Sequence, residues 1–294
     1  MELRVLKYFL MAAREENITR AAERLHITQP TLSRQLMQLE EELGVSLFKR
    51  GKHSISLTED GLLLKQRALE MATLEEKIFS DFSDPDGVLS GIISVGSGEL
   101  AGMSVLAEQM AAFRKKHQSV EFKVHSGIAD DIKFCMERGT IDIGLLTEPV
   151  DISKYGFIRM NKKERWGVII NRSHPLAEKK RITPKELSQE QLILAQRDSV
   201  RNEIANWFGE YFEDLKIAAT CDLLYNTVSL AKSGVGAAVS IESESLDSSL
   251  VFVPLKPSLE TGSVIVWKKN RAQSPAVREF IAHLKNAFKT LNEM

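Results

Sequence analysis

Apolar residues near the start of the chain recur at the spacing of short amphipathic helices. Three groups each mark one helix face: Leu6, Phe9, Leu10 and Ala13; Ala21, Ala22 and Leu25; and Leu32, Leu36, Leu39 and Leu43. Only His26-Ile27-Thr28 connects the helix that ends at Leu25 to the helix that begins at Gln29, and this connector is too short for anything but an angled turn. Thr28 suits a helix N-cap and Pro30 the first turn, where a missing N–H costs nothing. The spacing therefore predicts a helix-turn-helix.

The exposed face of the third helix carries residue types that read DNA. Small polar, amide and guanidinium groups suit base edges and phosphates in a major groove. The candidate contacts are Thr28, Gln29, Pro30, Thr31, Ser33, Arg34 and Gln38. The alternative is an ordinary helical hairpin, whose solvated face usually carries Lys and Glu, as this helix does only later at Glu40–Glu42. The polar start of the helix favours DNA binding.

Two short alternating segments follow, one on each side of a basic turn. Val45–Phe48 and Ser54–Leu57 alternate polar and apolar residues around Gly51, which is typical of a β-hairpin. The cationic candidates of the turn are Lys49, Arg50, Lys52 and His53. A solvated turn is the alternative, but the position directly after a helix-turn-helix favours a wing that contacts DNA. Residues 1–58 are therefore predicted to form a winged helix-turn-helix domain.

A long amphipathic helix is predicted over residues 59–83, capped at Thr58. Its apolar stripe has heptad-like steps and contains Leu64, Ala68, Met71, Ile78 and Phe82. Packing against its own domain is one explanation of this stripe. The length of the helix and its place between two domains favour pairing with a second copy, so we expect a dimerisation helix. Residues 84–90 are expected to form a hinge.

From Gly91 onward, strand-like and helix-like segments alternate in two sets. Such alternation predicts mostly parallel sheets covered by helices, and thus an α/β fold that follows the all-α winged helix-turn-helix. We expect lobe I at residues 91–161 and 267–294, and lobe II at residues 162–266. A small ligand would bind in the cleft between the lobes, at the carboxyl ends of the strands.

Composition and net charge exclude few classes of protein. The 294 residues suffice for two or three domains, and 43% hydrophobic and 27% charged residues are normal for a globular protein. The formal net charge is −1, while residues 1–58 hold nine Lys/Arg and seven Asp/Glu. The features that indicate DNA binding are therefore confined to the first domain. Because that domain carries so little positive charge, we expect two or more copies to bind DNA together.

Other sequence features indicate a cytoplasmic protein. No apolar run reaches the length of a membrane span, and the first residues do not resemble a signal peptide, so no membrane partner is expected. Cys135 and Cys221 match no disulfide or zinc spacing and are expected to be inert and buried. The six histidines are scattered, so we expect no metal site and no cofactor other than a small-molecule effector.

The loop Gly96–Gly102 is a loose relative of a dinucleotide-binding fingerprint. Its spacing is GxGxxxG, and no acidic residue ends the next strand, so a nicotinamide cofactor is not expected. A helix N-terminus that binds an anion or a polar ligand is the simpler interpretation. The chain contains no GxSxG, HExxH, CxxC or Walker motif, and we expect no enzymatic activity.

Together, these parts resemble LysR-type transcriptional regulators over nearly the whole chain. The resemblance rests on Ala21-Ala22-x-x-Leu25, Gln29-Pro30-x-x-Ser33-x-Gln35, Leu39-Glu40-x-x-Leu43-Gly44, Leu47-Phe48-x-Arg50 and Leu57-Thr58-x-x-Gly61. It implies a winged helix-turn-helix, a dimerising linker helix and a two-lobed effector domain similar to periplasmic binding proteins. One departure is His53, where the family often has an Arg. It removes one wing–phosphate contact or makes that contact pH-dependent.

The resemblance also implies the residues that line the effector cleft. By position, they are Ser97, Gly98, Glu99, Ser126 and Thr147 on one wall, and Asp198, Arg201 and Asn202 on the other. Many effectors of the family are small acids, which suit a helix N-terminus. Glu99 would oppose an anion if it points inward. Either Glu99 points away, or the effector is neutral or cationic.

The function implied by the resemblance is a transcriptional regulator switched by a small molecule. Homodimers would pair into a homotetramer on two half-sites of a double-stranded DNA operator, and RNA polymerase is a further candidate partner. Two alternatives stay open: a DNA-binding repressor that needs no effector, and a small-solute-binding protein, which would have no use for residues 1–82. Effector identity, operator sequence and the choice between activation and repression are open as well.

Overall fold

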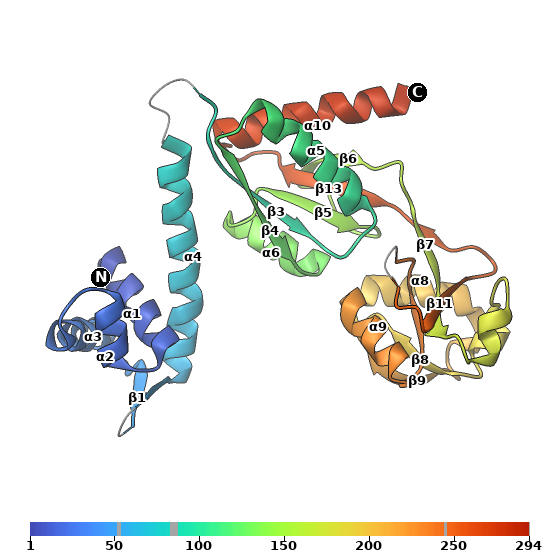
Figure 1. Ribbon diagram of the computed structural model, residues 1–294, viewed down its shortest axis with the longest axis horizontal. Helices are drawn as coiled ribbons and strands as arrows, with labels where there is room; N and C mark the ends of the chain where they lie inside the picture. The colour runs from blue at the N-terminus through green and yellow to red at the C-terminus, as the bar shows by residue number, and fades with distance from the viewer. Residues whose placement is uncertain (52–53, 83–87, 244–245, 294) are drawn as a thin grey trace. The chain divides into compact units, whose positions relative to one another are not determined.

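The computed structural model describes residues 1–51, 54–82, 88–243 and 246–293 (Figure 1). The chain divides into two compact units, Met1–Phe82 and Ser83–Met294. The first unit is mainly helical, and the second alternates strands and helices.

Three helices and a hairpin build the core of the first unit. They are α1 (Leu3–Glu15), α2 (Ile18–Arg24), α3 (Gln29–Leu43) and the antiparallel strands β1 (Phe48–Arg50) and β2 (Ile55–Leu57). The Asn17 side chain accepts a hydrogen bond from Arg20 N at 3.0 Å and so caps α2. The apolar faces of the helices and the hairpin meet in one buried cluster, so this unit has its own core.

The turn between α2 and α3 depends on one left-handed residue. His26 has a φ of 56°, and Ile27 N donates to Ala22 O at 3.0 Å. On the other side of the turn, Thr28 Oγ1 accepts from Thr31 N at 3.4 Å, and Pro30 lies in the first turn of α3. The turn and the cap together set the angle at which α3 leaves α2.

The hairpin is tied to the helices by two sets of hydrogen bonds. Ile55 N donates to Glu16 O at 2.9 Å. Glu40 Oε1 accepts from Leu47 N at 2.7 Å and from Phe48 N at 3.2 Å. A carboxylate on α3 therefore holds the point where the chain enters the hairpin.

Helix α4 (Glu59–Phe82) is capped by the preceding residue Thr58, whose Oγ1 accepts from Gly61 N at 2.9 Å. Ala68 is 1% exposed and belongs to the core cluster of the first unit, and Leu64 packs against that cluster. The prediction that Ala68 belongs to a dimerisation stripe is therefore wrong, while for the half-buried Leu64 it stays a prediction. The reason is that α4 packs on α1 and on strand β2 of its own domain.

Lobe I of the second unit is a five-stranded sheet with helices on both faces. Its elements are β3 (Gly91–Ser97), α5 (Gly102–Lys116), β4 (Val120–Ser126), α6 (Ala129–Arg138), β5 (Ile143–Thr147), β6 (Tyr155–Arg159), β13 (Ser263–Lys268) and α10 (Pro275–Glu293). The strand order is β4-β3-β5-β13-β6. Residues of α5 and α10 share one buried cluster with the sheet, and residues of α6 share another.

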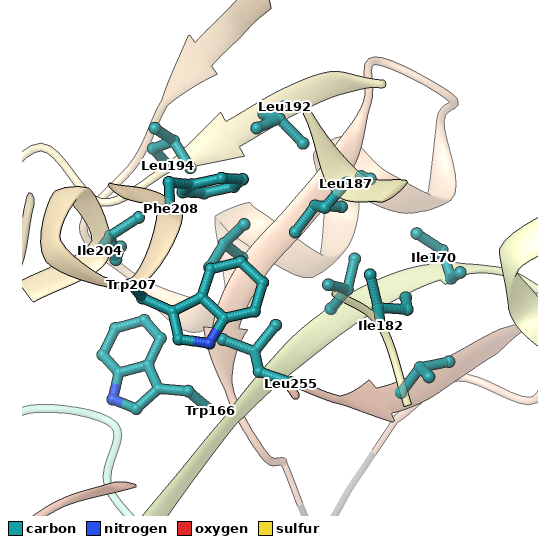
Figure 2. Packing of buried hydrophobic residues seen from close by; sticks show 14 of the residues in the cluster. Trp166, Ile170, Ile182, Leu187, Leu192, Leu194, Ile204, Trp207, Phe208 and Leu255 are labelled. Atoms are coloured by element: carbon teal, nitrogen blue, oxygen red, sulfur yellow. The ribbon is translucent and has the colours of Figure 1, made fainter. Parts of the chain in front are cut away.

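Lobe II is built around a second mixed sheet of order β11-β7-β10-β8-β9, with β12 paired to β7. Its strands are β7 (Glu164–Asn171), β8 (Gln191–Leu194), β9 (Lys216–Thr220), β10 (Ala237–Ile241), β11 (Leu250–Pro254) and β12 (Glu260–Thr261). Its helices are η1 (Pro175–Glu178), α7 (Pro184–Leu187), α8 (Asp198–Phe208), η2 (Gly209–Tyr211) and α9 (Leu224–Lys232). Trp207 and Phe208 of α8 lie in the main buried cluster with Leu187, Leu192 and Leu255 (Figure 2).

Two expectations about the second unit need correction. The sheets are not mostly parallel: β13 pairs antiparallel with β5 and β6, and β7 pairs antiparallel with β10 and β11. The start of the returning part of lobe I was placed too late, because residues 263–266 lie in β13 and thus in the sheet of lobe I. Both errors have one cause. The chain crosses from lobe I to lobe II between β6 and β7 and returns between β12 and β13, and the strands at these crossings pair antiparallel with their neighbours.

Candidate functional site

The outer face of α3 presents polar side chains to solvent. Leu32, Leu36 and Leu39 are buried on the opposite side of the helix. The predicted contact residues Thr28, Gln29, Pro30, Thr31, Arg34 and Gln38 are exposed, and Ser33 is half-buried. The hydroxyls of Thr28 and Thr31 share a hydrogen bond of 2.8 Å, which orders the first turn of the helix. The first turns of α3 therefore carry a contiguous polar surface.

Two residues of α3 lie where the sequence analysis did not place them. Leu43 is 40% exposed, although the apolar spacing placed it on the buried face, because the left-handed Gly44 ends the helix there. Met37 is 47% exposed and lies three residues after Arg34, on the same outer face. Helical spacing places Met37 about one turn after Arg34, so the sequence alone could have assigned this methionine to the outer face.

The hairpin adds cationic side chains near this helix. Lys49 is exposed on β1, opposite Ser56 in the hairpin register. Arg50 ends β1, and its side chain is outside the described part of the structure. Lys52 and His53, both predicted to contact DNA, lie outside the described residues.

The second half of α4 exposes large apolar side chains. Met71, Ile78 and Phe82 of the predicted stripe are 41%, 59% and 85% exposed. Further exposed apolar residues of this helix, absent from the prediction, are Leu62, Leu63, Leu69 and Phe79. Exposed apolar side chains therefore occur along the whole of α4, and the most exposed of them, Phe79 and Phe82, lie near its end.

The second unit contains a cavity between its two lobes, with a volume of about 130 Å³. Lobe I contributes the loop after β3, the start of α6 and the end of β5. Lobe II contributes the ends of β8 and β10, the residue Val200 on α8, and the start of α9. The cavity lies at the carboxyl ends of these strands, where α/β folds bind small ligands.

The structure brings together only part of the predicted cleft residues. Gly98, Glu99 and Thr147 line the cavity. Ser97 and Ser126 instead line an adjacent open groove, and Asp198 and Arg201 line another surface pocket. Asn202 is exposed and lines none of these three cavities. The expected wall at 198–202 is wrong because α8 presents Val200 to the cavity.

Polar residues that the sequence analysis missed also line the cavity: Arg197, Cys221, Asp222, Thr227 and Ser240. Cys221 and Cys135 are both free thiols and only half-buried, so the expectation that they are buried is wrong. The missed positions lie in the short connections next to α8 and between β9 and α9, or inside α9 and β10. Their orientation depends on how these elements pack, which spacing alone does not reveal.

Two charged side chains of the cavity wall, Glu99 and Arg197, make polar contacts from one lobe to the other. Glu99 Oε2, in lobe I, accepts from Tyr225 N at the start of α9 in lobe II, at 3.1 Å. Arg197 Nε donates to Asp130 Oδ2 at 3.2 Å, and its other nitrogens donate to the carbonyl oxygens of Thr147 and Pro149. These contacts join the two lobes across the cavity.

A further carboxylate lies at the start of α5. Glu164 is 2% exposed, and it accepts from Gly102 N at 3.0 Å and from Ala101 N at 3.3 Å. It thereby satisfies N–H groups that a helix otherwise leaves without a partner at its start. This helix N-terminus, which the sequence analysis considered for a ligand, is occupied by the chain itself.

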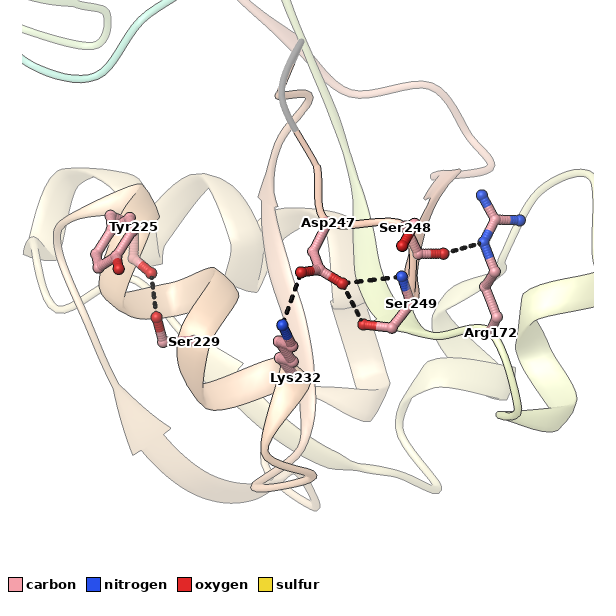
Figure 3. A network of polar contacts seen from close by, with 7 residues as sticks. All are labelled: Arg172, Tyr225, Ser229, Lys232, Asp247, Ser248 and Ser249. Carbon is pink, nitrogen blue, oxygen red and sulfur yellow. Dashed lines mark hydrogen bonds and ion pairs between the residues drawn. The ribbon is translucent and has the colours of Figure 1, made fainter.

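A polar network fixes the far end of α9 (Figure 3). Lys232 Nζ donates to Asp247 Oδ2 at 2.7 Å, and Asp247 Oδ1 accepts from the backbone and hydroxyl of Ser249. The hydrogen bond from Lys232 holds the pKa of Asp247 well below its usual range. Arg172 Nε donates to Ser248 O at 2.7 Å. The network anchors α9, whose start carries the Glu99 contact.

Two further findings bear on the kind of site. Among the residues that the structure describes, no group of three or more His, Cys, Asp or Glu side chains is placed to hold a metal ion. Within the same residues, no helix combines the length and apolarity needed to cross a bilayer.

A winged helix-turn-helix unit and a two-lobed α/β unit with a cavity between its lobes define a class of DNA-binding regulators that respond to small molecules. The sequence matches two family models: "Bacterial regulatory helix-turn-helix protein, lysR family" over residues 3–62, and "LysR substrate binding domain" over residues 86–289. The chain belongs to the LysR family of DNA-binding transcriptional regulators.

Relatives of known name support this assignment. The Hca operon transcriptional activator HcaR of Escherichia coli is 27% identical over 295 residues, which cover 96% of each chain. The regulator AlsR of Bacillus subtilis is 31% identical over 200 residues, 68% of this chain and 66% of AlsR. These relatives are transcriptional regulators.

Solved structures share the fold over nearly the full length. CbnR, a LysR family transcriptional regulator, superposes with a TM-score of 0.79 at 21% identity, covering 98% of this chain and 99% of CbnR. Full-length CbnR complexed with its target DNA gives a TM-score of 0.76 at 21% identity, and the match covers 98% of this chain and 100% of CbnR.

Proposed function

We propose that this regulator binds an operator through α3 and the β1–β2 hairpin, and that a small molecule in the interlobe cavity changes this binding. The observation that carries the proposal is the polar outer face of α3, which lies opposite the buried Leu32, Leu36 and Leu39. A helix with this division can enter a major groove without exposing its core. The proposal requires no cofactor.

Within this face, the residues have different tasks. Arg34 lies centrally and can donate two hydrogen bonds to a guanine edge, and Gln38 lies one turn further along. Gln29, Thr31 and Ser33 lie in the first turns of the helix, where polar side chains suit phosphates. Met37 offers an apolar contact for a thymine methyl group.

The second half of α4 supports a dimer. Ile78 and Phe82 expose apolar surface that a second copy of the helix would cover. Two copies of α3 would then contact two half-sites, and this pairing offsets the weak net charge of one DNA-binding unit. We extend the proposal to a tetramer of two such dimers.

The test is footprinting of the full chain on the DNA directly upstream of its own gene. The wild type should protect a site with two related halves. Arg34→Ala should cost about 1–3 kcal/mol in binding and relax the preference at one base of each half-site. Arg181→Ala, on an exposed residue of lobe II, is the matched control and should bind as the wild type does. Equal protection by wild type and Arg34→Ala would remove Arg34 from base recognition.

A further inference from the structure

The walls of the interlobe cavity are mostly apolar. Leu100, Ile128 and Leu145 contribute from lobe I, and Trp166, Leu194 and Val239 from lobe II. A volume of about 130 Å³ is close to the roughly 150 Å³ of a cavity that accepts benzene. The cavity therefore suits a compact ligand with an apolar body of about one ring.

The start of α5 does not offer a free anion site. The first N–H groups of a helix attract anions, because they lack partners within the helix and lie at the positive end of its dipole. Here the buried carboxylate of Glu164 accepts from both Ala101 N and Gly102 N. An anionic ligand at this position would meet a carboxylate that the chain already supplies.

The start of α9 is occupied in the same way. Glu99 reaches from lobe I to the backbone N–H of Tyr225 in lobe II, and Glu99 also lines the cavity. Two helix N-termini at the cleft are therefore each neutralised by a glutamate of the chain. Glu99 lies in the wall of this cavity and of the adjacent open groove, so its charge acts on the ligand space and, of the choices left open by the sequence, favours a neutral or cationic effector.

The guanidinium in the cavity wall is already paired. Among the described lining residues, the cation is Arg197, whose side chain is 11% exposed and donates to Asp130 and to two carbonyl oxygens of lobe I. Asp222 lines the cavity as well, and its carboxylate accepts from Gln196 N at 3.2 Å. The described lining therefore holds two carboxylates, Glu99 and Asp222, and one guanidinium that lobe I already pairs.

We propose that the effector of this regulator is a small amine, with an apolar body inside the cavity and an ammonium group that pairs with Glu99. This inference names the ligand class of the effector site and so rests on the proposed function. Glu99 is the specificity-determining residue, because its carboxylate attracts an ammonium group and repels a carboxylate of the same shape.

The test uses pairs of ligands that share a body and differ in charge. Isothermal titration calorimetry of the full chain would compare benzylamine with benzoate, cyclohexylamine with cyclohexanecarboxylate, and butylamine with butyrate. We expect at least one amine to bind, and each amine that binds to do so more tightly than its acid. In Glu99→Gln, the affinity for that amine should fall about tenfold, and its preference over the acid should shrink or reverse.

The matched control is Glu108→Gln, which removes an exposed carboxylate of α5 outside the cavity lining and should leave both affinities unchanged. Thermal unfolding would verify that both variants are folded. The proposal is overturned if an acid binds the wild type as tightly as its amine, if no amine binds, or if Glu99→Gln binds the amine unchanged. Operator binding is measured separately and without ligand. A negative ligand titration therefore leaves the DNA-binding proposal unaffected, and a failure of operator binding is detected independently of the ligand.

Discussion

Lys49 illustrates how single residues of the hairpin differ from those of α3. Its side chain is exposed on β1, and a lysine acts on phosphates as a point charge. Lys49→Ala should weaken binding to operator and random DNA alike, and lower the slope of log affinity against log salt by about one. Fluorescence anisotropy at several salt concentrations checks this. A loss confined to the operator sequence would show that Lys49 reads bases instead.

His26 is a second residue whose conformation has a measurable consequence. Its φ of 56° lies in the left-handed region, which glycine adopts freely and β-branched residues strongly disfavour. His26→Val should lower the free energy of unfolding by about 1 kcal/mol or more, whereas His26→Gly should be neutral or slightly stabilising. Urea unfolding of the full chain checks this order of stabilities. The quantity compared is the midpoint of the first unfolding transition that the substitutions shift. Equal stability of the Val and Gly variants would contradict it.

At the scale of elements, the cap of α7 predicts a pH dependence. Glu186 accepts from Lys179 Nζ, from Thr183 N and from the Thr183 hydroxyl, and these bonds lower its pKa from 4.5 to about 2. Because the folded state holds the carboxylate ionised, this stabilisation is full above about pH 4.5 and disappears as the pH falls toward 2. The stability advantage of wild type over Glu186→Gln should therefore shrink as the pH falls through this window.

Urea midpoints of wild type and Glu186→Gln between about pH 3 and pH 7 measure that difference. Glu203→Gln, on an exposed residue of α8, is the control and should show no comparable trend. A difference between wild type and Glu186→Gln that stays constant over the whole range would mean that the charged form of Glu186 is not what stabilises α7.

The elements of the first unit were largely predictable because their signals are local. Leu32, Leu36 and Leu39 follow helical spacing, and Thr28 and Pro30 mark the start of α3 within the same segment. Ala68 was wrongly assigned to the dimer interface because an apolar stripe on a helix can pack either in the core or against a partner helix. Only packing against α1 decides between the two.

The strands of the second unit were less predictable because their partners are distant in the chain. Strand β6 (Tyr155–Arg159) pairs with β13 more than a hundred residues later, and β11 (Leu250–Pro254) pairs with β7. Neither β6 nor β11 was predicted. The cavity wall at Arg197, rather than at Asp198, Arg201 and Asn202, depends in the same way on the orientation of α8.

At the scale of the whole molecule, the exposed apolar side chains near the end of α4 predict the state of assembly. Ile78→Ser combined with Phe82→Ser removes apolar surface that the monomer does not bury. Sedimentation should therefore show a smaller assembly with unchanged unfolding of the monomer, while Gln66→Ser, an exposed polar position of α4, should assemble normally. Normal assembly of the double variant would place the dimer contact elsewhere, for example at Leu62 and Leu69.

The central claim is that the molecule is a sequence-specific DNA-binding regulator, and one measurement tests it most directly. Fluorescence anisotropy would compare the full chain on the duplex directly upstream of its own gene and on a shuffled duplex of equal composition, across a range of salt. We predict that the upstream duplex binds at least about a thousandfold more tightly, and that both affinities fall as salt rises. Equal affinity for both duplexes at every salt concentration would contradict the account.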